Sequence, residues 1–506
     1  MSLWRRALFA SSKAALRVLA APVRRSEARA LENPAQAQEA LRQELTRAAA
    51  RTERGRSLGL DGAEDLAAFR AKVPLVAYEA LEPWIERQRQ SDQPLIAPDR
   101  VKFFETTSGS NGHKKLVPYT AALQRSMTRM FLLWASDVLE RGPTLETGLA
   151  YFSVSPRFQV PEATAGTPIG VEDDRDYLEG PTRALLEKLL VMVPGLPGLT
   201  TPGAFHDALL RRLLEEPRLE VISIWSPTFL LVVLEHAERD LERYAAGLEP
   251  DRAQALRERR WDQVWPALKL ISCWADGGSV LPARQLAERF PGVLLQPKGL
   301  LATEAPLTYP RIGLDGGVPL LDEVFFEFLT GAGDVRTLAE LQPGEEAEVV
   351  ISQRSGLLRY RLGDRVAVTG LVGKTPALRF LGRSQAVSDL VGEKLNEAVV
   401  AEALAALSLT SSVLIPDIAR RRYVLVTPGA ADANAFDRRL QAAFHYQRAR
   451  QLGQLEAPAH VRHAGLPQLL QRLFSQRGMK LGDLKDRALL WRPDEASAAL
   501  EALERP

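Results

Sequence analysis

The chain has 506 residues, with 65 lysines and arginines, 63 aspartates and glutamates, and a single cysteine, Cys273. At about 100–200 residues per domain, this length predicts roughly two to four domains whose cores need no disulfide or metal. One cysteine excludes an internal disulfide framework and any metal site made of clustered cysteines. A formal net charge of +2 argues against a strongly basic surface, so we expect no nucleic-acid partner.

Residues 1–32 form a basic segment in which apolar residues recur at helical spacing. Lys13 and Arg17 interrupt its apolar stretch, which argues against a secretory signal. Three interpretations stay open. They are an amphipathic helix lying on a membrane or another protein, an organellar transit peptide, and a surface helix packed on the main domain. We favour the third.

Residues 33–95 are predicted to form helices, and Pro74 and Pro83 mark interruptions between them. From about residue 100 onward, short apolar runs alternate with longer amphipathic stretches, which is typical of an α/β protein with a largely buried sheet. We expect strands at 101–104, 221–225, 268–273, 293–296, 324–329 and 347–352, and helices at 227–242 and 281–290.

A glycine-containing joint near 381–383 precedes a smaller unit of mixed character. Helices are expected at 393–407 and 433–452, and strands at 412–415 and 423–427. The sequence therefore predicts a large domain at 33–382 and a small α+β domain at 383–506.

The segment that follows the first expected strand is rich in hydroxyl and glycine residues. Small residues let backbone N–H groups approach an anion, hydroxyls add donors, and a lysine supplies positive charge. The segment matches neither the P-loop signature nor the nucleophile elbow, and a flexible turn is the alternative interpretation. The residues suited to phosphate are Thr107, Ser108, Gly109, Ser110, Asn111, Gly112 and Lys115.

Two carboxylates and one lysine complete the candidate set. Glu304 comes soon after the expected strand at 293–296, and a carboxylate at the carboxyl end of such a strand can hold Mg²⁺. Asp364 follows a strand-like run and a glycine turn, where it can accept hydrogen bonds from ribose hydroxyls. Lys485 lies in a glycine-marked loop near the end of the chain. Taken singly, each is more simply an ordinary loop or surface residue.

The hydroxyl- and glycine-rich segment and the segments with Glu304, Asp364 and Lys485 follow one another along the chain. Their order and spacing resemble the acyl-acid amido synthetases of the plant auxin- and jasmonate-conjugating family, in its bacterial branch. That family belongs to the adenylate-forming superfamily, and the resemblance runs from about residue 35 to the end. The family's third motif, Tyr-Arg-x-Gly-Asp, is met in full at residues 360–364. Its hinge stretch is matched by Phe380, Gly382, Arg383, Glu393, Lys394 and Glu397.

The chain also departs from the family pattern. Leu300 stands where the family has a tyrosine that stacks on adenine, and Ser110-Asn111 replaces Thr-Ser in the phosphate loop. The proline of the family's Lys-x-Pro-Arg string is missing after Lys485, so Lys480 competes with Lys485 for the role of the late lysine.

The resemblance implies a large adenylate-forming-type domain, a small mobile domain, and ATP and Mg²⁺ as cofactors. A carboxylic acid would be activated as acyl-AMP with release of pyrophosphate, and an amine, by preference an amino acid, would then displace AMP. The implied catalytic residues are Lys485, Lys115 and Glu304, with Glu304 the metal ligand. The implied nucleotide-binding residues are Thr107, Ser108, Gly109, Ser110, Asn111, Gly112, Thr303, Tyr360, Asp364 and Arg383.

Two alternatives stay open. Coenzyme A is a different acceptor for the same adenylate, and a non-catalytic member of the family would bind an acyl acid or a nucleotide only. We expect a cytoplasmic monomer. Peripheral membrane contact through the basic amino terminus is a further, weaker interpretation.

Overall fold

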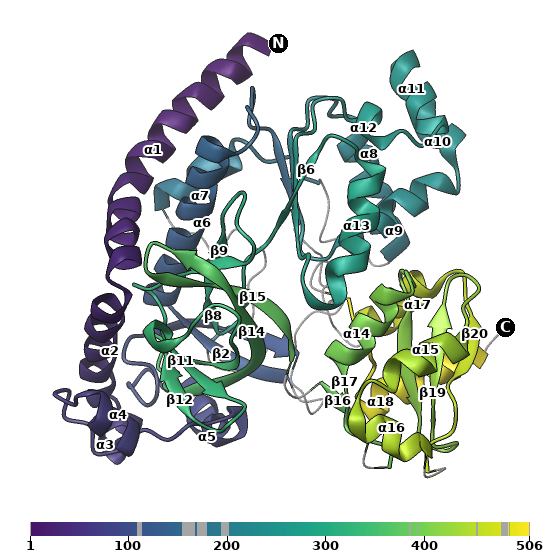
Figure 1. Cartoon of the computed structure of the whole chain (residues 1–506). Coiled ribbons are helices and arrows are strands. Elements are labelled where there is room, and N and C mark those ends of the chain that lie inside the picture. The colour runs from purple at the N-terminus through teal and green to yellow at the C-terminus, as the bar shows by residue number, and fades with distance from the viewer. Residues whose placement is uncertain are drawn as a thin grey trace. The chain divides into compact units, whose positions relative to one another are not determined.

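The computed structural model describes residues 2–504 apart from 109–113, 154–166, 170–179, 194–201, 384–385, 392, 452–453, 477–483 and 485 (Figure 1). The chain divides into two compact units, each with strands and helices, so the predicted α/β class is confirmed. Unit 1 comprises Met1–Glu146, Pro161–Lys188 and Lys298–Leu381, and unit 2 comprises Thr147–Val160, Leu189–Pro297 and Gly382–Pro506. The domain limits expected from the sequence stay a prediction.

Unit 1 is built on a seven-stranded sheet of order β12-β11-β13-β14-β15-β10-β9, beside the hairpins β1–β2 and β7–β8. Its helices are α1 (Ser2–Glu32), α2 (Pro34–Ala50), α3 (Glu53–Ser57), α4 (Leu66–Lys72), α5 (Tyr78–Arg89), α6 (Ala121–Arg141) and α7 (Gly180–Glu187). Its strands are β1 (Val101–Ser108), β2 (Lys114–Thr120), β7 (Leu301–Ala302), β8 (Ala305–Pro306), β9 (Thr308–Pro310), β10 (Gly317–Pro319), β11 (Phe325–Thr330), β12 (Val335–Thr337), β13 (Glu346–Ser352), β14 (Tyr360–Val372) and β15 (Thr375–Arg383).

Alternating side chains of the large sheet form the core of unit 1. Phe326 and Phe328 on β11 point to the same face, are fully buried, and stack with ring centroids 6.2 Å apart. Helix α2 is tied to this sheet by Gln38, whose amide nitrogen donates to the carbonyls of Leu321 and Val324, each at 2.8 Å. The expected strands at 324–329 and 347–352 are thereby confirmed as β11 and β13.

Helix α1 is a surface helix, as the favoured interpretation of residues 1–32 predicts. Its buried face, with Leu16, Ala20 and Val23, joins the core of unit 1, and most of its contacts are to α6. Two ion pairs reinforce it, Arg6 with Glu146 and Arg24 with Glu140. Across the described residues, helices are all too short or too polar to traverse a bilayer.

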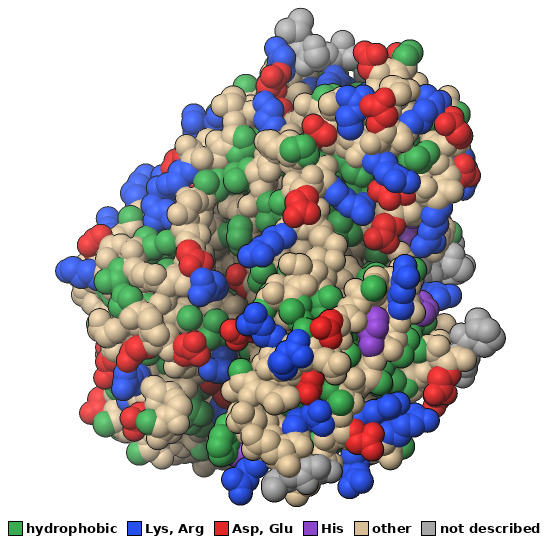
Figure 2. All heavy atoms as spheres, turned by 45° about the vertical axis from the view of Figure 1, so that its right-hand side comes forward, with side chains coloured by type: hydrophobic (Ala, Val, Ile, Leu, Met, Phe, Trp, Pro, Cys, Tyr) green, Lys and Arg blue, Asp and Glu red, His purple; other side chains and the backbone are tan. Residues whose placement is uncertain are grey.

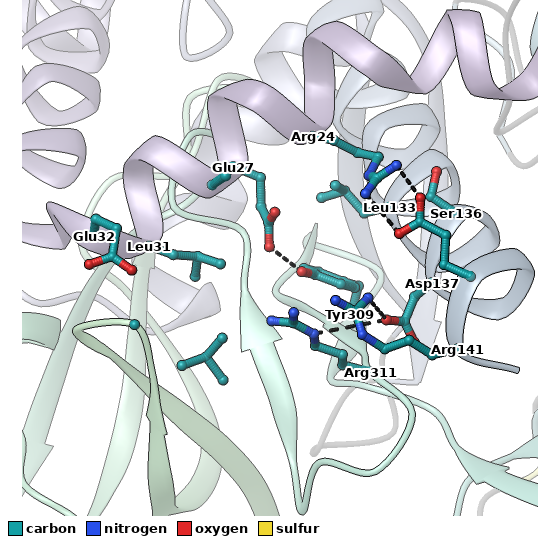
Figure 3. A pocket seen from close by; sticks show the side chains of 14 residues that line it. Arg24, Glu27, Leu31, Glu32, Leu133, Ser136, Asp137, Arg141, Tyr309 and Arg311 are labelled. Carbon is teal, nitrogen blue, oxygen red and sulfur yellow. Dashed lines mark hydrogen bonds and ion pairs between the residues drawn. The ribbon is translucent and has the colours of Figure 1, made fainter.

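A pocket of about 360 Å³ opens where α1 meets α6 and β9 (Figure 3). In this pocket the Glu27 carboxylate accepts a hydrogen bond from the Tyr309 hydroxyl, and the Asp137 carboxylate accepts one from the Arg141 guanidinium at 2.6 Å. Burial raises the pKa of Glu27. Of the predicted nucleotide-site residues that the structure describes, none lines this pocket.

Unit 2 contains a four-stranded sheet of order β3-β4-β5-β6, all parallel, and a three-stranded sheet of order β18-β19-β20. Its strands are β3 (Ala150–Phe152), β4 (Val221–Ser223), β5 (Leu270–Cys273), β6 (Leu294–Pro297), β16 (Val387–Ser388), β17 (Leu395–Asn396), β18 (Val413–Asp417), β19 (Arg422–Thr427) and β20 (Ala459–Arg462). Its helices are α8 (Pro202–Leu214), α9 (Pro227–Glu238), α10 (Leu241–Ala245), α11 (Pro250–Arg257), α12 (Trp261–Val264), α13 (Val280–Arg289), α14 (Glu397–Ala406), α15 (Ala433–Leu440), α16 (Phe444–Gln451), α17 (Leu466–Gln476) and α18 (Pro493–Glu504).

Two hydrophobic cores hold unit 2 together. One runs from the helices of the parallel sheet, including Phe229 of α9, to one face of the three-stranded sheet at Val424 and Val426. The second lies on the opposite face and contains Tyr423 and Phe436. Residues 382–506 therefore share a continuous core with the parallel sheet.

Three expected helices have different limits in the structure. The helix expected at 393–407 begins only at Glu397, because the Asn396 side chain caps it by accepting from the Ala398 N–H at 2.8 Å. The helix expected at 433–452 is two helices, α15 and α16, and the one expected at 227–242 ends at Glu238.

Charges of both signs are distributed over the surface. On the face in Figure 2, lysines and arginines alternate with aspartates and glutamates among the described residues. Such mixing gives short-range ion pairs instead of a field of one sign.

Candidate nucleotide-binding site

Glu304 lies in the two-residue turn of the hairpin β7–β8, in which Ala302 pairs with Ala305. The strand expected at 293–296 is present as β6, but β7 lies between it and Glu304, so the carboxylate is in a hairpin turn and not directly at the end of that strand. Its side chain is buried, and the hydroxyl of Tyr360 donates to Oε1 at 3.3 Å. The Gln353 amide nitrogen donates to the Glu304 carbonyl at 3.0 Å and holds the turn in place.

The same turn is tied to the hairpin β1–β2. The hydroxyl of Tyr119 on β2 donates to the Thr303 carbonyl at 2.8 Å. The Tyr119 ring stacks on Phe103 of β1, with ring centroids 4.8 Å apart. Burial raises the pKa of Tyr119 well above its ordinary value, with Glu105 and Glu304 adding to the effect, so the hydroxyl keeps its proton and stays a donor.

Lys115 stands on β2 opposite Thr107 of β1. Its ammonium lies 5.2 Å from the centre of the Tyr78 ring and 4.0 Å from Glu79 Oε1, which is a loose ion pair. The Tyr78 hydroxyl accepts from the Leu116 N–H at 2.7 Å and so locks α5 against β2. Within the part of the chain that the structure describes, the ammonium therefore lies near an aromatic ring, and a single loose ion pair compensates its charge.

Asp364 lies inside strand β14, where the sequence predicted a turn. Between the pairs Glu348–Arg365 and Val350–Arg361, the partner strand β13 advances by two residues and β14 by four, which makes a bulge. Gly363, at φ +79°, supplies the left-handed backbone that the bulge needs. Bulges of this kind redirect a side chain out of the regular alternation, and here the redirected residue is the buried Asp364.

The residue before Tyr360 is held in an unusual backbone conformation. Arg359 has φ +46°, and its guanidinium donates to Glu327 Oε2 and to the Val73 carbonyl, each at 2.8 Å. On either side of Tyr360, the backbone pairs with Val76 through bonds of 3.1 Å and 2.8 Å. Strained residues persist only where their surroundings over-determine them, so Tyr360 is presented rigidly to Glu304.

The other predicted residues belong to unit 2 or lie outside the described residues. Arg383 is the last residue of β15 and belongs to unit 2. Burial raises the pKa of the Glu397 carboxyl in that unit, and the positive charge of Arg383 opposes the rise. Residues 109–113 of the phosphate loop and Lys485 lie outside the described residues, as do the side chains of Thr107 and Ser108. Their roles stay predictions.

Leu300 occupies the position where the resembling family has an aromatic residue. Its side chain is buried in the core of unit 1, and its N–H donates to the Thr308 hydroxyl at 2.7 Å. The residue is thus fixed by packing.

Two residues of the cluster escaped the sequence analysis. Gln353 and Tyr119 act through side-chain bonds to backbone carbonyls of the turn, and nothing in their local sequence distinguishes them from core or strand residues. Tyr78 lies within residues 33–95, for which the sequence predicts helices only, and its contacts to β2 cannot be derived from that pattern.

The metal-binding chemistry of the described part of the chain is sparse. Groups of three or more His, Cys, Asp or Glu side chains able to hold an ion are absent from these residues. A single buried carboxylate such as Glu304 suits Mg²⁺ that arrives on substrate phosphates, because this ion is usually bound by one or two carboxylates plus phosphate oxygens.

Comparison with known proteins agrees with this architecture. The chain superposes with a TM-score of 0.80 on an acyl acid amido synthetase in complex with 2,4-DB, covering 95% of each chain at 18% identity. It superposes with a TM-score of 0.55 on a 2-hydroxyisobutyryl-CoA ligase in the postadenylation state, covering 93% of this chain and 92% of that one at 15% identity. The fold is therefore that of the adenylate-forming ligases.

Two stretches of the chain also match domains of the GH3 family. The model of the family's N-terminal domain matches residues 25–190, and that of its central domain matches residues 317–383. An indole-3-acetic acid-amido synthetase of Oryza sativa subsp. indica is 27% identical over 68% of this chain and 66% of its own length. Another of Arabidopsis thaliana is 22% identical over 74% and 78%.

Proposed function

We propose that the protein is an ATP-dependent acyl-acid amido synthetase. It activates a carboxylic acid as acyl-AMP with release of pyrophosphate, and then transfers the acyl group to an amine, by preference an amino acid. One observation carries the proposal. The turn that carries the buried Glu304, which accepts a hydrogen bond from Tyr360, is bonded through Tyr119 to β2, the strand that also carries Lys115 and follows a loop with the composition of a phosphate cradle. The names of the GH3 relatives support the same reaction.

Each residue has a distinct task in the first half-reaction. Thr107 to Gly112 surround the β- and γ-phosphates, and Lys115 adds a positive charge beside them. Asp364, Thr303 and Tyr360 orient the nucleoside, and Asp364 accepts from the ribose hydroxyls. Positioning and charge neutralisation are what such a phosphoryl reaction requires from the protein.

Magnesium fits Glu304, because its carboxylate is buried and its second oxygen is not used by Tyr360. When bound with ATP, the ion would neutralise charge on the phosphates. Arg383 and Lys485 come from unit 2, and we assign Lys485 to the attacking carboxylate and the α-phosphate.

Turnover of ATP to AMP with pyrophosphate release tests this function. The acids to be compared are indole-3-acetic acid, which the relatives' names contain, other aromatic acids, fatty acids and hydroxy acids, with and without mixed amino acids. We expect acid-dependent pyrophosphate, amino-acid-dependent AMP and the mass of a new amide. If no acid elicits pyrophosphate and calorimetry detects no ATP binding, the function is wrong.

The acceptor is a separate question. The likeness to a CoA ligase favours coenzyme A as the second candidate acceptor. Pyrophosphate release with a thioester product, and no amide with any amino acid, would select that candidate.

We further propose the bacterial branch of the family, a cytoplasmic location and a monomeric state. Identities of 22–27% to plant relatives support a distant branch. Contact of α1 with a membrane is a weaker proposal, because its apolar face is already packed against α6. Failure to bind anionic vesicles at low salt would dismiss it.

A further inference from the structure

Asp486 is bound by hydroxyl groups from two helices of the parallel sheet in unit 2. The Ser279 hydroxyl donates to its Oδ2 at 3.0 Å, and the Ser226 hydroxyl donates to the same oxygen at 3.2 Å. Thr228 contributes a third side-chain hydrogen bond. The carboxylate of a residue near the end of the chain is thus held by residues more than 200 positions earlier.

Both serines are N-cap residues, yet neither caps its own helix. Ser226 precedes α9 and Ser279 precedes α13, and neither side chain accepts a hydrogen bond from the first turn of its helix. An N-cap serine ordinarily accepts such a bond, which stabilises the helix. Here both hydroxyls donate outward instead, and the two helix N-termini favour the negative charge that they hold. The local needs of α9 and α13 do not explain this arrangement.

Asp486 and the hydroxyls that hold it, together called the anchor, lie at the carboxyl edge of the parallel sheet. Helix α9 follows β4 and α13 follows β5, and these strands are parallel neighbours, so their carboxyl ends share one edge. In open α/β sheets ligands bind at this edge. Leu484 is buried in the core of unit 2, so both sequence neighbours of Lys485 are fixed there.

We propose that Asp486 is a positioning residue for adenylate formation. It holds its own segment at the carboxyl edge of β4 and β5 and acts through its sequence neighbour Lys485. The proposal rests on the proposed function, because it gives Lys485 its task. Burial raises the pKa of Asp486 to about 6, and the hydroxyl hydrogen bonds oppose this rise because they favour the ionised carboxylate.

Hydrogen exchange without substrates tests the anchor independently of activity. The variants are Asp486→Ala and the double variant Ser226→Ala/Ser279→Ala. Asp432→Ala is the control, because Asp432 caps α15 from an exposed position in the same unit. We expect faster exchange over 484–490 in the first two variants only. Unchanged exchange there in both variants would overturn the anchor, even if the wild-type protein proves inactive.

The two half-reactions then test positioning. In Asp486→Ala, kcat for acid-dependent pyrophosphate release should fall about ten- to a hundredfold, with KM for ATP nearly unchanged. Transfer from supplied acyl-AMP to the amine should keep its rate, and Asp486→Asn should recover adenylation to within about threefold, because its amide also bonds hydroxyls. Equal losses in both half-reactions, with no recovery by asparagine, would show a merely structural role. Absence of wild-type pyrophosphate release would instead reject the proposed function.

Discussion

The hydroxyl of Tyr360 donates to Glu304 Oε1 at 3.3 Å, and so joins the bulged strand β14 to the β7–β8 turn. If Glu304 holds the metal, removal of its charge should cost far more than removal of this bond. We expect Glu304→Gln to lower pyrophosphate release about a hundredfold or more. Tyr360→Phe should lower it only about fivefold, the cost of about 1 kcal/mol for one lost hydrogen bond.

Titration with Mg²⁺ separates these roles. Glu304→Gln should need much more Mg²⁺ for half-maximal rate, whereas Tyr360→Phe should shift that concentration slightly. Tyr309→Phe removes the hydroxyl of another tyrosine–glutamate pair, formed with Glu27 outside the predicted site residues, so it is the matched control and should leave the rate unchanged. A Glu304→Gln enzyme with wild-type Mg²⁺ dependence would contradict the assignment.

Lys115 should act on the triphosphate by charge. Among the described residues, its ammonium pairs with Glu79 alone, at a loose 4.0 Å, which neutralises little of its charge. We expect Lys115→Ala to raise KM for ATP about tenfold, in line with a lost charge-assisted bond. The exposed Lys374 gives the control, and Lys374→Ala should leave KM unchanged. If Lys115→Ala and Lys374→Ala have equal KM values for ATP, Lys115 does not bind the triphosphate.

The motifs predicted more of this molecule than the periodicity did. Residues 360–364 and Glu304 were singled out by pattern, and the structure brings Tyr360 and Glu304 into contact. Their setting was not predictable, because the bulge before Asp364 depends on the register of β13 and β14, which are paired across a turn. Asp486 could not be found from sequence either, since Ser226 and Ser279 look like ordinary N-caps until their hydroxyls are seen to donate elsewhere.

Arg359 should matter for stability because it forms a buried ion pair. Its side chain and that of Glu327 are 6% and 1% exposed, so removal of the arginine leaves a buried charge with only Arg70 beside it. We expect Arg359→Ala to lower the free energy of unfolding by about 3–5 kcal/mol. Arg70→Ala should cost less, because Arg70 is 28% exposed. Urea denaturation of both variants checks the order, and a reversed order would contradict this account.

Glu64 should make the stability of unit 1 depend on pH in the acid range. Its carboxylate accepts from the Asp61 and Gly62 N–H groups at 2.9 and 3.0 Å and from the Lys72 ammonium at 2.7 Å. These bonds outweigh the burial that opposes them and lower its pKa from 4.5 to about 2. Because the folded pKa lies below the unfolded one, the stabilisation is complete above about pH 5 and is lost as pH falls from 4.5 toward 2. Glu64→Gln should therefore be less stable than wild type by about 2 kcal/mol near pH 7, and the gap should close as the pH falls through that window. Chemical denaturation at several pH values measures it, with Glu288→Gln, at an exposed position, as the control. A gap that stays constant down to pH 3 would mean that Glu64 stabilises the fold by its shape and not by its charge.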